Sequence, residues 1–174
     1  MSTAVSDRPR AVERLAEDYS GSAPAYARLW GPTILPLTLP LLDELPLGAA
    51  RRVLDVGTGS GDLLPHLRAR APRARVVGVD GSSGMLAEAA ARGRGPLVMM
   101  DARALAVPGR AIDVVSFAFV LFHLPRPAEA LREARRVLRA EGAVGLVSWS
   151  DASPPLPGEK IWREELARQG AGAD

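Results

Sequence analysis

Short apolar runs alternate with amphipathic segments through the centre of the chain, from residue 51 to residue 149. Five of these runs are rich in β-branched residues and almost continuously apolar, as strands covered on both faces are; they span residues 52–56, 75–80, 97–100, 112–118 and 142–149. Helical patterns separate them, most clearly over residues 127–140, where apolar residues recur at helical spacing opposite arginine and glutamate. This alternation predicts an α/β fold built on a mainly parallel sheet.

The N-terminal segment predicts helices that cap the sheet. An apolar helical face is formed by Val12, Leu15, Ala16 and Tyr19. The polar sequence at 20–22 predicts a loop, and a second short helix follows at 25–30. The apolar stretch 34–47 contains prolines and acids, so it predicts a short buried or interfacial helix and not a membrane span.

The chain divides into three predicted parts. Residues 1–48 form the helical cap, residues 49–150 form the core, and residues 151–174 form a partial C-terminal segment. In that last part, proline and serine at 151–158 predict a loop, and the charged pattern at 159–169 predicts a helix.

Composition narrows the function classes. The 174 residues suffice for about one domain, with 47% hydrophobic and 24% charged residues. No cysteine is present, which excludes disulfides, thiolate metal sites and cysteine nucleophiles, and we predict no metal site. The net charge of +2 is scattered along the chain and gives no reason to expect nucleic-acid binding. The N-terminus lacks the apolar run of a secretion signal, so a cytoplasmic location is expected.

A glycine-rich turn carries the strongest local signal. The strand at 52–56 runs directly into Gly57-Thr58-Gly59-Ser60-Gly61, and a helical pattern follows. Alternate glycines let the backbone approach a ligand closely, and amides at a helix start favour an anionic group. A tight connection without a ligand is the alternative. The dinucleotide fingerprint fails in both frames, because Asp62 or Leu64 stands where it requires glycine or alanine, and no P-loop lysine follows.

Acidic residues accompany the later strands. Asp80 ends the second strand, where a carboxylate can bind the paired hydroxyls of a ribose. The alternative for Asp80 is to cap the helix that begins near Ser82, although Ser82 or its neighbour could serve instead. Asp101 follows the third strand and Asp113 opens the fourth. We expect three strand ends to bring polar groups to one edge of the sheet.

The ordered set of motifs resembles class I S-adenosylmethionine (SAM) methyltransferases, particularly the small-molecule branch of ubiquinone/menaquinone-biosynthesis-like enzymes. The resemblance covers residues 50–150 and rests on Asp55-x-Gly57-x-Gly59-x-Gly61, Asp80, Met100-Asp101-Ala102, Asp113-Val114-Val115-Ser116 and the segment 136–142. It implies a Rossmann-like, doubly wound sheet, SAM as cofactor, and methyl transfer to a small-molecule acceptor. Residues 139–142 depart from the turn that is common in the family, which puts the geometry of that turn in doubt.

The same resemblance implies the cofactor-binding residues, namely Asp55, Gly57, Thr58, Gly59, Gly61, Asp80, Gly81, Met85, Asp101, Ala102, Ser116 and Phe117. The three glycines would line the methionine part, Asp80 would bind the ribose, and Asp55 would support the loop and the cofactor's amino group. Met85 would touch the adenine, Asp101 would bond its amino group beside Ala102, and Ser116 and Phe117 would approach the sulfonium.

Methyl transfer needs a base only when the acceptor must lose a proton. His123 is the candidate base, with a structural role at a helix end as its alternative; His66 is expected at the surface. Tyr26 and Trp30 could close over the cofactor or acceptor, or pack in the core. A catalytically degenerate SAM-binding module and an NAD-type oxidoreductase are the competing functions.

The end of the predicted sheet is incomplete in comparison with the family. The last two of the usual seven strands have no counterpart, since only residues 150–174 follow the fifth strand. Its apolar edge would be left unpaired, which favours aggregation or pairing. The C-terminal helix, a second chain, or strands of a longer gene product could cover it. We expect a truncated product that self-associates through this edge and has weak activity.

Overall fold

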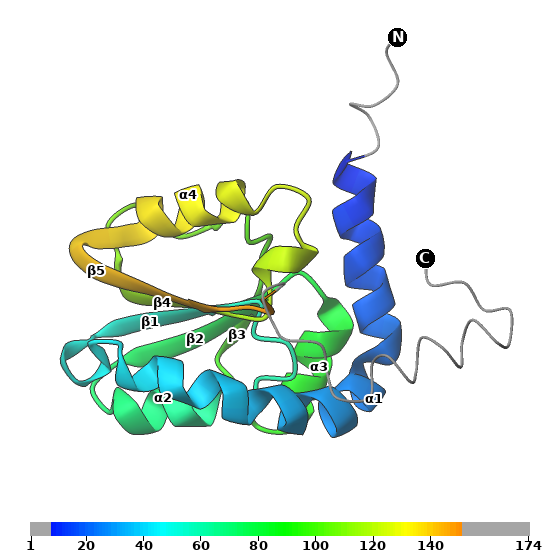
Figure 1. Cartoon of the computed structure of the whole chain (residues 1–174), viewed down its shortest axis with the longest axis horizontal. Helices are drawn as coiled ribbons and strands as arrows, with labels where there is room; N and C mark the ends of the chain where they lie inside the picture. The colour runs from blue at the N-terminus through cyan, green and yellow to red at the C-terminus, as the bar shows by residue number, and fades with distance from the viewer. Residues whose placement is uncertain (1–7, 151–174) are drawn as a thin grey trace, which may run out of the picture.

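A five-stranded parallel sheet forms the centre of the computed structural model, which describes the backbone of residues 8–150 and the side chains of residues 12–150. The strands are β1 (Arg52–Val56), β2 (Arg75–Asp80), β3 (Leu97–Met99), β4 (Ile112–Ala118) and β5 (Leu138–Val147), in the order β3-β2-β1-β4-β5 (Figure 1). The strand order reverses between β1 and β4. The carboxyl ends of these two strands therefore flank the crevice where open α/β sheets bind ligands, and the predicted fold class is confirmed.

Helices cover both faces of the sheet (Figure 1). α4 (Pro127–Val137) lies on one face, and α2 (Leu64–Arg70) lies on the other beside the later part of α1 (Arg8–Asp43). α3 (Ser83–Ala91) lies near β3. The structure also contains two short 3-10 helices, η1 (Leu47–Ala49) and η2 (Leu121–His123). The side chains of β1 alternate between two apolar cores. Leu54 and Val56 pack toward α4, and Val53 packs toward α2. Both cores hold the strand ends rigidly in place.

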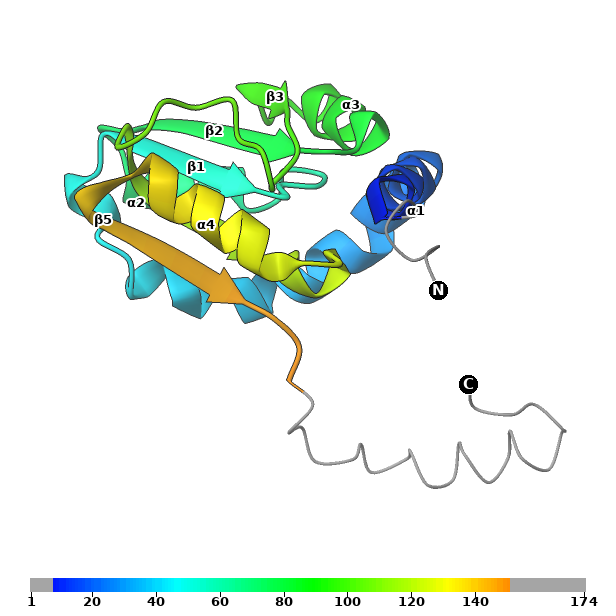
Figure 2. The same cartoon turned by 90° about the horizontal axis from the view of Figure 1, so that it is seen from above.

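The N-terminal cap is one bent helix and not two helices. α1 continues through residues 20–22, where the sequence predicts a loop, and contains four prolines. Proline removes a backbone donor and kinks a helix, and the first half of α1 turns away from the second to stand beside α3 at the end of the sheet (Figures 1 and 2). Gly84 permits this contact, because a Cβ there would lie 2.5 Å from the carbonyl oxygen of Ser20. The loop expectation is wrong because this packing keeps the segment helical.

The junction between α4 and β5 lies earlier than the helical pattern predicts. α4 ends at Val137, and β5 begins at Leu138 by pairing with Ile112, whereas the pattern continues to residue 140. Residues 139–142 then stand opposite the single residue Asp113. Asp113 accepts hydrogen bonds at 2.8 Å from the backbone N–H groups of Arg51 and Arg52. It therefore lies at the amino edge of the sheet, away from the edge at which β1, β2 and β3 end.

β5 is an outer strand of the sheet, as predicted (Figure 2). Its side chains Val144 and Leu146 are exposed. The predicted loop and helix of residues 151–169 lie outside the described residues. None of the helices within residues 8–150 has the length and apolar character that a membrane crossing requires.

Candidate functional site

The glycine-rich turn after β1 has the backbone conformation that its sequence predicts. Gly57, Gly59 and Gly61 have φ angles of 72°, 55° and 74°, a region that side-chained residues rarely adopt. Gly57 donates its N–H to the carbonyl of Val79 at 2.8 Å. A Cβ at Gly57 would overlap Val120, and one at Gly59 would lie 3.1 Å from the Met85 methyl. Both the φ angles and the close packing against Val120 and Met85 therefore require glycine at these positions.

Asp55 supports this turn from below. Its buried carboxylate accepts hydrogen bonds of 2.7 Å from the hydroxyls of Thr58 and Ser116. Burial raises the pKa of Asp55 although the hydroxyls of Ser116 and Thr58 act in the opposite direction. Through these hydrogen bonds the carboxylate joins β1, the turn and β4.

Asp80 is held at the end of β2 by backbone amides. One carboxylate oxygen accepts from the N–H of Gly59 and the other from the N–H of Ser82, both at 2.8 Å. Burial raises the pKa of Asp80, while these amides lower it. The N-cap of α3 is Ser82, whose hydroxyl accepts from the N–H of Met85 at 3.2 Å. The capping alternative for Asp80 is therefore wrong, and its carboxylate faces a cavity.

This cavity has a volume of about 350 Å³ and lies at the carboxyl ends of the strands, with α1 along one side. We call it the first cavity. Of the residues expected to bind the cofactor, those that line it are Gly57, Gly59, Asp80, Gly81, Met85, Asp101 and Ala102. Residues from three different strand ends therefore meet around one space.

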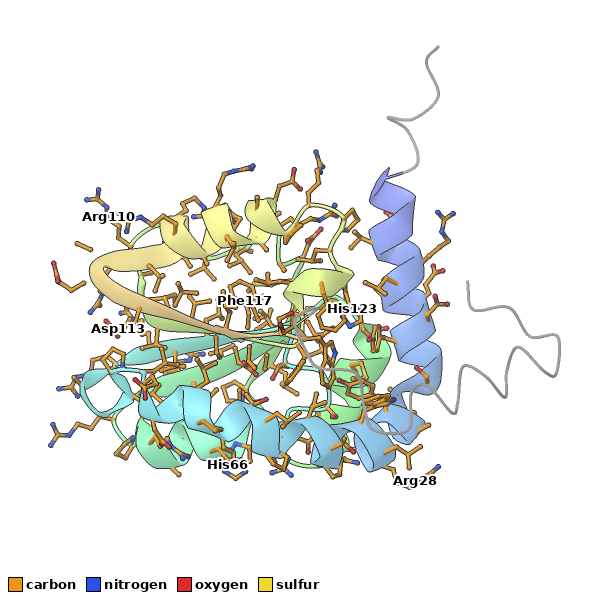
Figure 3. All side chains as sticks on the ribbon, viewed as in Figure 1. Arg28, His66, Arg110, Asp113, Phe117 and His123 are labelled. Carbon is orange, nitrogen blue, oxygen red and sulfur yellow. The ribbon has the colours of Figure 1, made fainter. Side chains whose placement is uncertain are left out.

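Five expected cofactor residues do not line the first cavity, namely Asp55, Thr58, Gly61, Ser116 and Phe117. Ser116 and Phe117 have no exposed surface: Ser116 bonds to Asp55, and Phe117 packs in the core on the α4 side (Figure 3). The expectation that these two approach the sulfonium is wrong, because β4 continues to Ala118. Gly61 packs behind the turn, where a Cβ would lie 2.8 Å from the Cβ of Arg94.

Asp101 lines the cavity with a carboxylate that is already paired. Arg103 donates to it from Nη2 at 2.7 Å, from Nε at 3.0 Å and from its backbone N–H at 2.8 Å. The hydrogen bonds from Arg103 hold the pKa of Asp101 below its usual range. Asp101 is therefore an ionised acceptor whose orientation the arginine fixes.

His123 and Tyr19 form a polar pair in the cavity wall. The Tyr19 hydroxyl lies 2.9 Å from His123 Nε2, and the two rings meet edge to face. Burial lowers the pKa of His123, so its imidazole is neutral at pH 7. His66 lies on α2, away from the cavity and half-buried (Figure 3). A neutral imidazole in contact with a hydroxyl can accept a proton.

The aromatic residues of α1 differ in their environments. Tyr26 lines the first cavity, and burial, with smaller contributions from Tyr19, Asp80 and Asp62, raises its pKa to about 12. Trp30 is 51% exposed, so core packing does not explain it. Phe119 and Val120 also line the cavity, and the sequence did not identify them as site residues. The sequence predicted the apolar face of the first helix, but it did not predict that this face borders a cavity.

Comparisons with known proteins agree with this geometry. The profile of the methyltransferase domain family matches residues 54–146. The ubiquinone/menaquinone biosynthesis C-methyltransferase UbiE of Syntrophotalea carbinolica is 36% identical over 118 residues, which are 65% of this chain and 50% of that protein. Demethylmenaquinone methyltransferase of Thermus thermophilus is 40% identical over 114 residues, 63% of this chain and 50% of that protein. The chain thus spans about half the length of these curated relatives.

Solved structures show the same fold. The DhpI–SAH complex is 27% identical with a TM-score of 0.65, over 81% of this chain and 70% of that one. The [4+2]-cyclase SpnF is 30% identical with a TM-score of 0.57, over 71% of this chain and 49% of that one. One of these structures is named as a complex with SAH and the other as a cyclase, so the fold alone does not define the reaction.

Proposed function

Because the chain belongs to the methyltransferase domain family, we propose that it binds SAM in the first cavity and transfers the methyl group to a small-molecule acceptor. The observation that carries this proposal is the carboxylate of Asp80, held by two backbone amides beside a turn whose Gly57 and Gly59 line the same cavity. A cavity of about 350 Å³ is large enough for a small-molecule ligand. The residues present therefore fit the cofactor.

We assign one part of SAM to each group of lining residues. The backbone at Gly57 and Gly59 would hold the methionine part, and the Asp80 carboxylate would accept hydrogen bonds from the ribose hydroxyls. Met85 and Ala102 offer apolar surface to the adenine, and Asp101 offers its carboxylate oxygens. When bound, SAM supplies an electrophilic methyl group on a sulfonium. The chain itself needs only to align the acceptor and exclude water.

His123 and Tyr19 supply the proton acceptor that a hydroxyl or carbon acid would require. The neutral imidazole of His123 takes up the proton, and the hydroxyl of Tyr19 at 2.9 Å fixes the ring. First-cavity residues of α1 cover the site on one side and limit water there. A His123→Ala variant would then lose turnover with such an acceptor while keeping cofactor affinity.

Binding and turnover are tested separately, because a cyclase shares the fold. Calorimetric titration with S-adenosylhomocysteine (SAH) should show binding, and NADH should not bind. Asp80→Ala should weaken SAH binding by about 1 to 3 kcal/mol through loss of a buried hydrogen-bond acceptor. Asp113→Ala, at the opposite edge of the sheet, is the matched control. Equal affinity of the wild type and Asp80→Ala would contradict the assignment, and transfer of isotope-labelled methyl from SAM to candidate acceptors tests turnover.

A further inference from the structure

Three carboxylates line the first cavity, and they are held in different ways. Glu13 comes from α1, Asp80 from the end of β2, and Asp101 from the segment after β3. Among residues 12–150, no lysine or arginine lines this cavity. Backbone amides bind Asp80, whereas a cation, Arg103, binds Asp101 from behind the cavity wall. Arg103 can therefore act on a ligand only through Asp101.

Arg103 grips the carboxylate of Asp101 with a fork of donors. Nη2 donates to Oδ2 at 2.7 Å, and the backbone N–H donates to Oδ1 at 2.8 Å. Nε is shared between the two oxygens, at 3.0 and 3.1 Å. A bidentate arginine fixes the plane of a carboxylate as well as its position. An ionised carboxylate has about four acceptor sites, so these donors leave acceptor capacity for a ligand.

The same pair sets the charge of Asp101. The side chain of Arg103 is only 18% exposed and that of Asp101 is 37% exposed, so water screens the pair incompletely. Hydrogen bonds from Arg103 lower the pKa of Asp101 more than burial raises it. Without Arg103, burial would remain and the hydrogen bonds would be lost. The pKa of Asp101 would then rise above its ordinary value.

Other carboxylates surround the guanidinium. Hydrogen bonding to Asp101 raises the pKa of Arg103 against the effect of burial. The negative charges of Glu129, in the first turn of α4, and of Glu13 raise it further. Loss of Arg103 would leave these like charges near Asp101 without their cation, which also favours the protonated acid. The other titratable groups of the cavity wall besides the acids are neutral at pH 7, namely Tyr19, Tyr26 and His123.

On the basis of the proposed function, we propose that Arg103 is a positioning residue that makes the first cavity select a purine with an exocyclic amino group over one with a carbonyl oxygen in its place. A carboxylate has no hydrogen to donate, so it accepts from an amino group but opposes a carbonyl as acceptor against acceptor. A protonated Asp101 would donate to the carbonyl and lose this discrimination. Arg103 thus controls selectivity through the charge and orientation of Asp101.

Two ligands that differ in one group test this inference. SAH and S-inosylhomocysteine (SIH), which has a carbonyl oxygen where SAH has the amino group, are titrated into the full chain by calorimetry between about pH 5 and pH 7. Their ribose and methionine parts are identical, so titration of Asp80 and His123 cancels in the ratio of the two affinities. We expect the wild type to prefer SAH by about tenfold or more at every pH.

Two replacements of Arg103 separate its charge from its geometry. In Arg103→Gln, the preference for SAH should fall about tenfold as the pH decreases and Asp101 becomes protonated. Arg103→Lys keeps the charge but not the fork, so its preference should be smaller than that of the wild type but independent of pH. Arg70→Gln is the matched control, because Arg70 donates to Asp43 at 2.8 Å but does not line the cavity.

The ligand-free chain distinguishes this inference from the proposed function. The carboxyl carbon of Asp101, followed by NMR, should titrate below the ordinary aspartate value in the wild type and above it in Arg103→Gln. An unchanged Asp101 pKa in that variant would overturn the inference, as would equal affinity of the wild type for SAH and SIH. A preference that falls equally in both Arg103 variants at every pH would assign a structural role only and overturn it too. Failure of the wild type to bind either ligand would contradict the proposed function and the selectivity with it.

Discussion

Gly57→Ala should destabilise the fold through two separable effects. The φ angle of 72° is unfavourable for any residue with a Cβ, at about 1 to 2 kcal/mol. The new Cβ would also overlap the side chain of Val120, with its Cγ1 at 2.8 Å. Val120 is β-branched and turns only with difficulty, so this overlap adds about 1 to 3 kcal/mol. Together the two effects predict a loss of about 2 to 5 kcal/mol in the free energy of unfolding.

Gly93 supplies the matched control for the backbone effect. Its φ angle is 68°, but a Cβ there would have nothing within 4 Å. Gly93→Ala should therefore cost only the backbone contribution, about 1 to 2 kcal/mol. The overlap at Gly57 is isolated by a double-mutant cycle with Val120→Ala, which should show a favourable coupling of about 1 to 3 kcal/mol.

Urea unfolding, followed by circular dichroism at one pH, measures all four variants against the wild type. Equal losses for Gly57→Ala and Gly93→Ala would refute the overlap with Val120. A cycle with no coupling would lead to the same conclusion. SAH titration should show weaker binding in Gly57→Ala than in Gly93→Ala, because Gly57 lines the first cavity and Gly93 does not.

Two further predictions concern groups at opposite edges of the sheet. Asp113→Ala should lower the free energy of unfolding by about 1 to 2 kcal/mol in urea, since two backbone amides and Arg139 lose their acceptor; an unchanged midpoint would contradict this. In a His66→Gln variant, the single remaining imidazole, His123, should titrate below 6.5 by NMR. Between pH 6.5 and the pKa of His123 in the folded state, the unfolded state binds more protons, so acidification through this range should destabilise the fold. A pKa of His123 at or above 6.5 in the folded variant would refute the effect of burial.

The strands that the sequence predicts best are those buried on both faces. The bounds of β1, β2 and β4 agree with the apolar runs at 52–56, 75–80 and 112–118. In each case, β-branched residues fill the strand, and glycine or a polar residue lies close to its end. The local pattern and the packing therefore favour the same structure, which is the condition under which local prediction succeeds.

The N-terminal helix and the start of β5 depend on contacts that local patterns do not contain. Ser20 has its hydroxyl 2.8 Å from that of Ser82, so α3 holds the segment where serine and glycine predict a loop. At the other end, Leu138 fits the helical stripe of α4 but pairs with Ile112 as a strand. In both places, tertiary contacts override intrinsic propensity.

The cofactor residues show how strand register divides polar groups that look equivalent in sequence. Asp55 in β1 and Ser116 in β4 are direct partners in the parallel pairing of these strands. Asp55 lies two residues before the glycine-rich turn, and Ser116 lies two residues before the end of β4. Their side chains therefore meet inside the fold. Asp80 is the last residue of β2, and Asp101 follows β3, and both line the cavity. Position relative to the strand end thus decides whether a polar group supports the site or faces the ligand. By the same reasoning, residues 118–120 and not Ser116 are the part of this segment that contacts the cofactor cavity, because β4 ends only at Ala118.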